Sequence, residues 1–290
     1  MRVAGASFMA VILLLIAFSV VTGREFHLEG DEVIGTINHY VVREGDSLIE
    51  LARSFGLGFN EITDANPGVD PFVPKTGSTL RLPLSWILPA VHRAEGIVIN
   101  LAEMRLYCFP SGAPGVVVTF PIGIGDEGRE TPVGSYTVTA KQKSPSWIVP
   151  MSIRRERPDL PARVPPGPDN PLGSHVLRLS GGSILIHGTN KPWGVGRKAS
   201  HGCIRLYPED ISELFRLTPK GMRVVIMREP VKIGLKGTRV FIEVHGGEEV
   251  DYGKEALRLV MIRGLLPRID PAKFFRALRE KSGMPEDISL

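Results

Sequence analysis

The residues with the clearest capacity for chemistry form the stretch Ser-His-Gly-Cys-Ile-Arg-Leu at positions 200–206. Cys203 is one of only two cysteines in the chain, and His187 lies a short way before it in the sequence. A thiol becomes a nucleophile when a base or a cationic neighbour draws its proton away. His187, His201 and Arg205 supply such neighbours, so the pattern predicts a thiolate nucleophile.

The positions around the two main residues fit covalent acyl transfer. His187 ends the apolar run 184–186 and is followed by Gly188, which predicts that its ring emerges at the edge of a sheet. Gly202 leaves space for backbone N–H groups beside Cys203 to face an incoming carbonyl, as in an oxyanion hole. The sequence therefore indicates a cysteine–histidine pair that forms an acyl intermediate.

Three alternatives to a catalytic pair stay open from the residues alone. Cys203 could be a small buried hydrophobe and His187 a structural residue. Cys108 and Cys203 could form a disulfide in an oxidising compartment. His187, His201 and Cys203 could bind zinc with one open position, although no carboxylate or second Cys-x-x-Cys motif supports such a site.

A second motif matches a cofactor-binding pattern but lacks the structural context that the pattern requires. Residues 123–128, Gly-Ile-Gly-Asp-Glu-Gly, match the dinucleotide-binding pattern G-x-G-x-x-G. That motif requires a helix opening at its last glycine, whereas here Pro132 and Gly134 lead into another strand-like run. The glycines are therefore predicted to serve a turn, and no cofactor is expected.

The elements that must position the cysteine and histidine are mostly short strands. From Gly96 to Glu229, Val- and Ile-rich runs alternate with turn residues, which is typical of a mostly antiparallel sheet or sandwich. One helix is predicted at 208–217, with a proline in its first turn. The proline-rich segment 143–173, which contains Trp147, shows no periodicity and is predicted to form a lid or wall beside the site.

Residues 38–83 form a separate small unit. A short strand, a turn at Gly45, a helix capped by Ser47, a second helix over about 60–66 and a returning strand are predicted. Its patterns Gly-Asp-Ser-Leu, Ala-Asn-Pro-Gly-Val-Asp and Leu-Arg-Leu-Pro resemble a LysM domain over the whole segment. The resemblance implies that the unit binds the glycan strands of peptidoglycan.

The rest of the central region resembles the YkuD-type L,D-transpeptidase domain over residues 96–229. The resemblance depends on His-Gly-Thr-Asn and Ser-His-Gly-Cys-Ile-Arg-Leu, preceded by Pro-Ile-Gly-Ile-Gly, Thr-Pro-Val-Gly-Ser-Tyr-Thr-Val and Pro-Asp-Asn-Pro-Leu-Gly. Together with a LysM domain, it is similar to the enterobacterial subgroup that links an outer-membrane lipoprotein to peptidoglycan. The implied fold is mainly β: a YkuD-type β-sandwich with one or two short helices, a β-α-α-β LysM domain, and a C-terminal β/helical extension.

The resemblance also implies catalytic roles. Cys203 would be the nucleophile, and His187 the base that holds it as thiolate. The backbone carbonyl of Gly188 would orient the imidazole in place of a carboxylate.

Four further positions complete the implied signature. Ser200, Gly202 and Arg205 would shape the oxyanion and substrate site, with Arg205 organising the pocket or meeting a substrate carboxylate. His201 is expected to have a supporting role only, because some members of the lipoprotein-linking subgroup have serine there.

The implied reaction attacks the third residue of a peptidoglycan tetrapeptide stem, usually diaminopimelate, and releases D-alanine. The acyl group would pass to an amine, either of another stem in a 3→3 crosslink or of a lipoprotein lysine. Carbapenem-type β-lactams would acylate the same cysteine. The alternatives are an L,D-carboxypeptidase with water as acceptor, and a non-catalytic wall-binding protein that uses the LysM unit alone.

Composition and the chain ends set the remaining expectations. The formal charge is +4, with no dense basic run outside 154–157, so no nucleic-acid partner is expected. Arg2 and the apolar run 3–23 predict a signal peptide over 1–23 and export to the periplasm, with an uncleaved anchor as the alternative. Residues 84–95 are predicted to be a linker that can pack against both units, and 230–290 an extension that packs on the catalytic domain.

Overall fold

The computed structural model describes residues 23–90 and 96–290. The predicted signal peptide therefore lies outside the described residues, apart from Gly23. Within those two ranges, no helix combines the length and the apolar character that a membrane crossing requires.

A nine-stranded sheet forms the centre of the molecule, in the order β1-β8-β7-β6-β17-β10-β13-β14-β16. Neighbouring strands are antiparallel except for the pairs β6–β17 and β14–β16, which are parallel. The prediction of a mainly β fold with few helices is confirmed. The strands are β1 (Arg24–His27), β6 (Gly96–Asn100), β7 (Arg105–Phe109), β8 (Val116–Pro121), β10 (Gly134–Lys143), β13 (His175–Leu179), β14 (Leu185–His187), β16 (Ile204–Arg205) and β17 (Arg223–Met227).

One helix packs against this sheet and closes its main core. Helix α4 (Pro208–Leu217) begins with a proline at its first position and occupies the residues that the sequence predicted. It buries Ile211 and Leu214 in the cluster that also contains Ile186 and Ile204, from the two strands that lead to the site. Burial of this apolar surface holds β14 and β16 in place. The short elements around them are β9 (Ile124–Gly125), β11 (Trp147–Ile148), α3 (Met151–Glu156), β12 (Arg163–Val164), a 3₁₀ turn (Pro192–Gly194) and β15 (Lys198–Ser200).

The segment before the LysM unit belongs to the catalytic sheet, a pairing that the local sequence does not indicate. Strand β1 pairs antiparallel with β8 at the sheet edge. Strands β2 (Val33–Gly35) and β5 (Ser85–Ile87) then pair with each other on either side of the LysM unit. The described part of segment 84–95 contains β5, and Trp86 is buried there.

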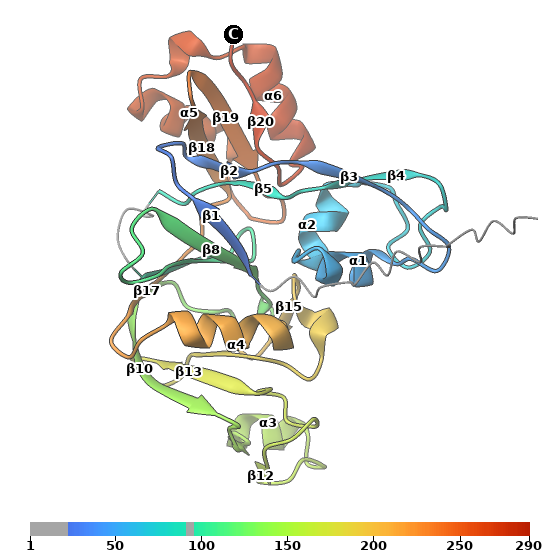
Figure 1. Ribbon diagram of the computed structural model, residues 1–290, viewed down its shortest axis with the longest axis vertical. Coiled ribbons are helices and arrows are strands. Elements are labelled where there is room, and N and C mark those ends of the chain that lie inside the picture. Colours follow the sequence, from blue (N-terminus) through green and yellow to red (C-terminus); the bar gives the residue numbers. More distant parts are fainter. Residues whose placement is uncertain (1–22, 91–95) are drawn as a thin grey trace, which may run out of the picture.

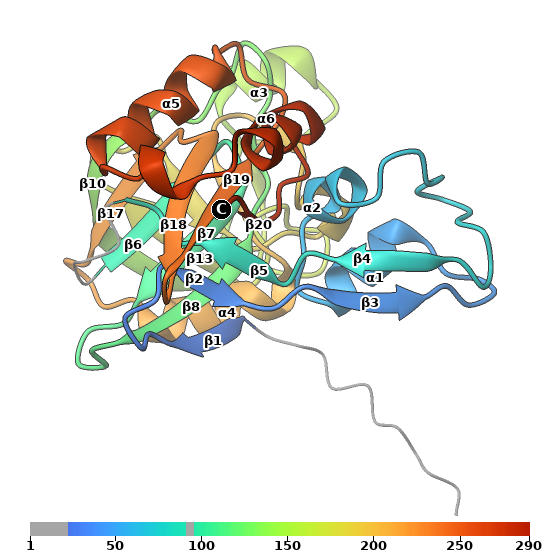
Figure 2. The same cartoon turned by 90° about the horizontal axis from the view of Figure 1, so that it is seen from above.

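The LysM unit has the predicted strand–helix–helix–strand order. Its elements are β3 (Asn38–Val41), α1 (Leu48–Ser54), α2 (Phe59–Asp64) and β4 (Thr79–Leu82), and the two strands pair antiparallel. Ser47 caps α1 as predicted, since its hydroxyl accepts the N–H of Glu50 at 3.3 Å. The unit projects sideways from the catalytic sheet (Figure 2).

A buried ion pair fixes the LysM unit to the sheet. The guanidinium of Arg105, on β7, donates to both carboxylate oxygens of Glu61, on α2, at 2.8 and 2.7 Å. The Trp86 indole N–H donates to the same carboxylate at 2.9 Å, and the Arg105 guanidinium lies 4.0 Å from the centre of the indole ring. Because these groups are almost fully shielded from solvent, the contact belongs to the protein interior.

The chain after Glu229 forms a third core at the top of the molecule (Figure 1). Asp270 caps the last helix, and Phe274 is buried. The next residue, Phe275, is 63% exposed. The elements are β18 (Val231–Lys236), β19 (Arg239–Val244), α5 (Tyr252–Ile262), a 3₁₀ turn (Leu266–Arg268), α6 (Pro271–Glu280) and β20 (Glu286–Asp287).

Lys232 joins this C-terminal unit to the catalytic sheet. Its ammonium lies 2.7 Å from a carboxylate oxygen of Glu103 and 2.8 Å from one of Glu243. Tyr107 donates to Glu103 and His245 lies 2.7 Å from Glu243, so the buried charges are all partnered. The ammonium accounts for the clustering of Glu103, Glu243 and His245 without a metal ion.

Candidate active site

Two adjacent parallel strands bring His187 and Cys203 into one cavity. Strand β14 ends at His187, and its register with β16 pairs Ile186 with Ile204. Cys203 directly precedes β16, level with Leu185 in this register, and its thiol lies 4.0 Å from the Ser183 oxygen. Both side chains line a cavity of about 970 Å³. The two residues singled out from the sequence therefore share one cavity.

The imidazole of His187 is held by its own neighbour in the chain. Its side chain is buried, and Nδ1 lies 2.6 Å from the backbone oxygen of Gly188. Because a carbonyl oxygen only accepts, Nδ1 carries the proton and Nε2 is left unprotonated in the neutral ring. This is the orientation expected of a general base.

Burial acts against a charge on both His187 and Cys203. It lowers the pKa of His187 to about 4, with the charge of Arg205 acting in the same direction. Burial also raises the pKa of the Cys203 thiol, although the Leu185 N–H and the Arg205 charge act in the opposite direction. Both shifts favour a neutral thiol beside a neutral imidazole, whereas the sequence pattern predicts a thiolate.

The backbone at Gly202 and Cys203 is arranged as an oxyanion site requires. Gly202 has φ +92°, a conformation that side chains rarely adopt. Among the described residues, the N–H groups of Gly202 and Cys203 have no hydrogen-bond acceptor. Ser200 donates its hydroxyl to the Cys203 carbonyl at 2.5 Å, which fixes the loop between them.

His201 contacts two charged side chains, Arg129 and Glu156. Its Nε2 lies 2.7 Å from a guanidinium nitrogen of Arg129 and 3.4 Å from the carboxylate of Glu156. Arg129 and Glu156 form an ion pair of their own at 2.6 Å. His201 thus connects the cysteine loop to helix α3 rather than to the reacting atoms.

Helix α3 belongs to the proline-rich segment that was predicted to flank the site. The segment is more regular than expected, since β11 pairs with β12 and α3 lies between them. Trp147, Ile153 and Leu172 from this segment line the cavity that contains Cys203. The segment therefore forms one wall of the cavity.

The cavity is strongly cationic. Arg178, Arg197 and Arg205 line it, and Asp169 is the one acidic residue among the described side chains that line it. The Nε atoms of Arg197 and Arg205 are shielded from solvent and have no acceptor within the described chain. Arg178 and Arg197 were not among the residues predicted from the sequence; the signal for Arg197 was the basic loop between the two motifs.

The structure contradicts the disulfide and zinc alternatives for Cys203. Cys108 is buried in β7 with its pKa raised by burial to about 12, and both cysteines are free thiols. Within residues 23–90 and 96–290, His187, His201 and Cys203 do not meet as a metal-binding group. The glycine motif at 123–128 opens no helix, because β9 is followed by a turn and β10.

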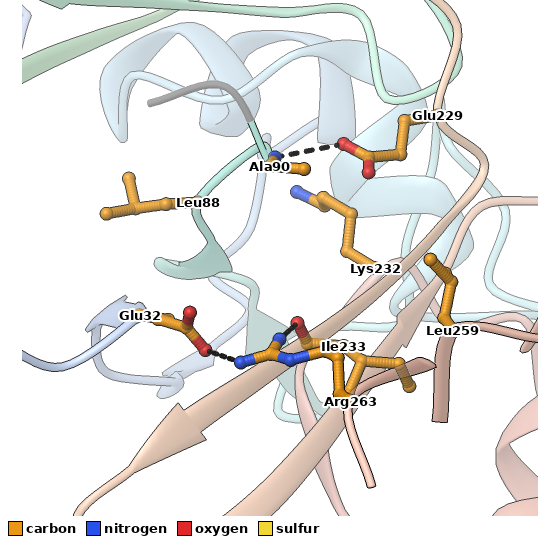
Figure 3. A pocket seen from close by; sticks show the side chains of 8 residues that line it. All are labelled: Glu32, Leu88, Ala90, Glu229, Lys232, Ile233, Leu259 and Arg263. Atoms are coloured by element: carbon orange, nitrogen blue, oxygen red, sulfur yellow. Dashed lines mark hydrogen bonds and ion pairs between the residues drawn. The ribbon is translucent and has the colours of Figure 1, made fainter. Parts of the chain in front are cut away.

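A second, smaller cavity of about 320 Å³ lies where the C-terminal unit meets strand β5 (Figure 3). The described side chains that line it include no thiol, hydroxyl or imidazole, so they offer no nucleophile of these types. Arg263 donates to Glu32 at 2.5 Å across it, and the Ala90 N–H donates to Glu229 at 3.4 Å. Its lining residues are Glu32, Leu88, Ala90, Glu229, Lys232, Ile233, Leu259 and Arg263.

Comparison with known proteins identifies two domains in the chain. Residues 94–226 match the family of L,D-transpeptidase catalytic domains, and residues 40–83 match LysM domains. The chain is 39% identical to the probable L,D-transpeptidase YcfS of Escherichia coli, over 89% of this chain and 86% of the relative. It is also 39% identical to the probable L,D-transpeptidase ErfK/SrfK of Salmonella typhimurium, over 96% and 94% of the two chains.

The chain also resembles a solved structure, the catalytic domain of the E. faecium L,D-transpeptidase acylated by ertapenem. That structure is 21% identical, with a TM-score of 0.36, over 46% of this chain and 98% of that chain. The two matched domains and the long alignments to the curated relatives confirm both resemblances noted in the sequence. The chain belongs to the L,D-transpeptidase family and carries a LysM domain.

Proposed function

We propose that Cys203 is the nucleophile of this L,D-transpeptidase and that His187 is its general base. The observation that carries the proposal is that His187, at the end of β14, and Cys203, just before β16, line one cationic cavity. A cationic cavity fits a peptidoglycan stem, because a tetrapeptide stem carries free carboxylates.

Acylation would begin with proton transfer from the Cys203 thiol to Nε2 of His187 as the sulfur attacks the carbonyl carbon of the third stem residue. The N–H groups of Gly202 and Cys203 would stabilise the tetrahedral oxyanion. Collapse of the intermediate breaks the amide bond, and D-alanine leaves after its amine takes the proton from His187. A thioester on Cys203 remains.

The second half of the reaction would transfer the acyl group to an amine. The amine attacks the thioester carbonyl and gives a proton to His187, and the Cys203 thiolate leaves and recovers that proton. The acceptor would be the side-chain amine of another stem, giving a 3→3 crosslink, or a lysine of an outer-membrane lipoprotein. Carbapenem-type β-lactams would trap the same sulfur by acylation.

The rest of the chain fits action on the cell wall. The LysM unit would bind the glycan strands, and the N-terminal apolar run would direct export to the periplasm. An L,D-carboxypeptidase would use the same residues with water as acceptor, and the wall of residues 143–173 favours transfer because a shielded thioester meets less water.

Product analysis tests the proposed function. Purified enzyme is incubated with labelled tetrapeptide, with and without an acceptor stem or an acceptor lipoprotein. Crosslinked or conjugated product supports transfer, whereas tripeptide alone in every reaction shows a carboxypeptidase. Product formation that survives in a Cys203→Ala variant contradicts the role of the cysteine.

A further inference from the structure

The LysM unit contacts the wall of the catalytic cavity directly. The chain between the two sequence motifs, residues 191–197, forms a loop that we call the bridging loop. The N–H groups of Phe59 and Asn60, at the start of α2, each donate at 3.3 Å to backbone oxygens of this loop. The bridging loop is therefore bonded to the LysM helix as well as to the catalytic sheet.

Gly196 permits this close approach. A Cβ atom at Gly196 would lie 2.1 Å from the Phe59 nitrogen, and its φ of +76° favours glycine. The Gly196 N–H donates to the Ile122 oxygen at 3.0 Å, which ties the same point of the loop to the catalytic sheet. A shift of α2 would therefore move the loop.

Arg197 ends the bridging loop and belongs to both units. Its guanidinium carbon lies 3.9 Å from the centre of the Phe59 ring, and its side chain lines the cavity that contains Cys203. Stacking on an aromatic face restricts a guanidinium to one plane and leaves its N–H groups free to donate at the edge.

Arg197 lacks the partner that a stacked arginine in a cavity would normally have. Its side chain makes no hydrogen bond or ion pair within residues 23–90 and 96–290, and its Nε atom is shielded from solvent. Arg105 shows the contrast, because its guanidinium also lies over an aromatic ring but is paired with Glu61. A donor held in place without an acceptor is suited to an incoming anion.

We propose that Arg197 is a specificity-determining residue that binds a carboxylate of the donor peptide, and that Phe59 of the LysM unit is the positioning residue that holds it. The LysM unit would then contribute to recognition of the stem itself, independently of any glycan. This inference rests on the proposed function, since it assumes that the stem is the donor in this cavity.

The test uses a soluble tetrapeptide without sugar and measures kcat and KM for acylation of the full chain. Arg197→Ala is expected to raise KM about tenfold with kcat within about twofold, because a charge-assisted hydrogen bond is lost. Phe59→Ala is expected to raise KM about three- to tenfold on the same glycan-free donor, since it removes the stack. Phe59→Tyr keeps an aromatic face and is expected to restore the wild-type KM.

Donors amidated at one carboxylate at a time identify the recognised group. One amidated donor is expected to raise the wild-type KM as far as Arg197→Ala does, and to leave the KM of Arg197→Ala unchanged. Phe72→Ala is the matched control, because Phe72 is an aromatic residue of the same LysM unit that is 63% exposed. Its KM should equal that of the wild type.

Several results would overturn the inference. An unchanged KM in Arg197→Ala would contradict the carboxylate contact. A fall in kcat alone in Phe59→Ala would show that Phe59 has only a structural role. If Phe59→Ala lowers the melting temperature, Phe59→Leu keeps the packing volume without the π face and must still raise KM. A wild-type enzyme that forms no acyl-enzyme with the tetrapeptide overturns the proposed function itself, before any variant is compared.

Discussion

The backbone oxygen of Gly188 lies 2.6 Å from Nδ1 of His187, so a peptide carbonyl takes the orienting role that a carboxylate has in a catalytic triad. A carbonyl fixes the ring without placing a negative charge beside it. The imidazole therefore gains no stabilisation of its charged form from an acidic partner, and burial lowers the pKa of His187 to about 4.

His187→Gln is expected to slow acylation by about 10²- to 10⁴-fold, because the variant has no base to take the thiol proton. The rate of adduct formation on Cys203, followed by mass spectrometry, measures the effect. His39→Gln is the control, since His39 is exposed on the LysM unit. Acylation of His187→Gln at a rate within about tenfold of the wild type would reject the general-base role.

The pKa shifts predict how alkylation of Cys203 depends on pH. Because the thiol pKa is raised, the thiolate fraction should grow about tenfold per pH unit from about pH 6 to about pH 9. The alkylation rate of the Cys203 peptide with iodoacetamide should rise in the same way. A rate that is already constant across this range would instead show a preformed thiolate–imidazolium pair.

The lowered pKa of His187 also predicts the pH below which the reaction slows in acid. The lowered pKa of His187 means that its neutral form persists as pH falls to about 4. The value of kcat/KM should therefore fall only near that pH. An unshifted histidine would lose its basic form near its ordinary pKa of about 6.5. Acylation with a tetrapeptide donor across this range distinguishes the two cases.

Glu156 links the wall of the cavity to the cysteine loop through Arg129 and His201. Glu156→Gln is expected to loosen helix α3 and to raise the ratio of hydrolysis to amine transfer by about two- to tenfold, because more water reaches the thioester. Chromatography of the two products measures the ratio. Glu127→Gln is the control, because Glu127 is exposed and has no ion pair in the described chain, and this variant should leave the ratio unchanged. An unchanged ratio in both variants would refute the role of Glu156 in shielding the thioester from water.

Lys232 is the cation on which the junction of the C-terminal unit depends. Lys232→Ala leaves Glu103 and Glu243 buried without their shared partner and is expected to lower the free energy of unfolding by roughly 3–5 kcal/mol. Lys236→Ala, at an exposed position of the same strand, should change it by less than about 0.5 kcal/mol. Denaturant unfolding checks both, and equal stability of the two variants would show that the cluster is not a structural junction.

The sequence was most informative where the signal is local. Ser47 caps α1 and Pro208 opens α4 as predicted, because caps and first-turn prolines depend on a few neighbouring residues. Cys203 and His187 were also found, since each lies in a short motif beside an apolar run.

Features that depend on distant residues were missed. The pairing of β1 with β8 joins residues on either side of the LysM unit, and nothing in the local sequence of 24–27 specifies it. Likewise the stacking of Arg197 on Phe59 joins two residues that are far apart in the sequence. The effect of burial on Cys203, which raises the pKa of its thiol against the lowering effect of Arg205, also depends on the folded surroundings and cannot be read from the sequence.

The most direct test of the central claim is the intact mass of the enzyme after brief incubation with a tetrapeptide stem. The predicted result is a single mass increase equal to the tetrapeptide minus one D-alanine molecule, located on the Cys203 peptide and absent in Cys203→Ala. An adduct that persists in Cys203→Ala, or one that maps to another residue, would contradict the role of this cysteine.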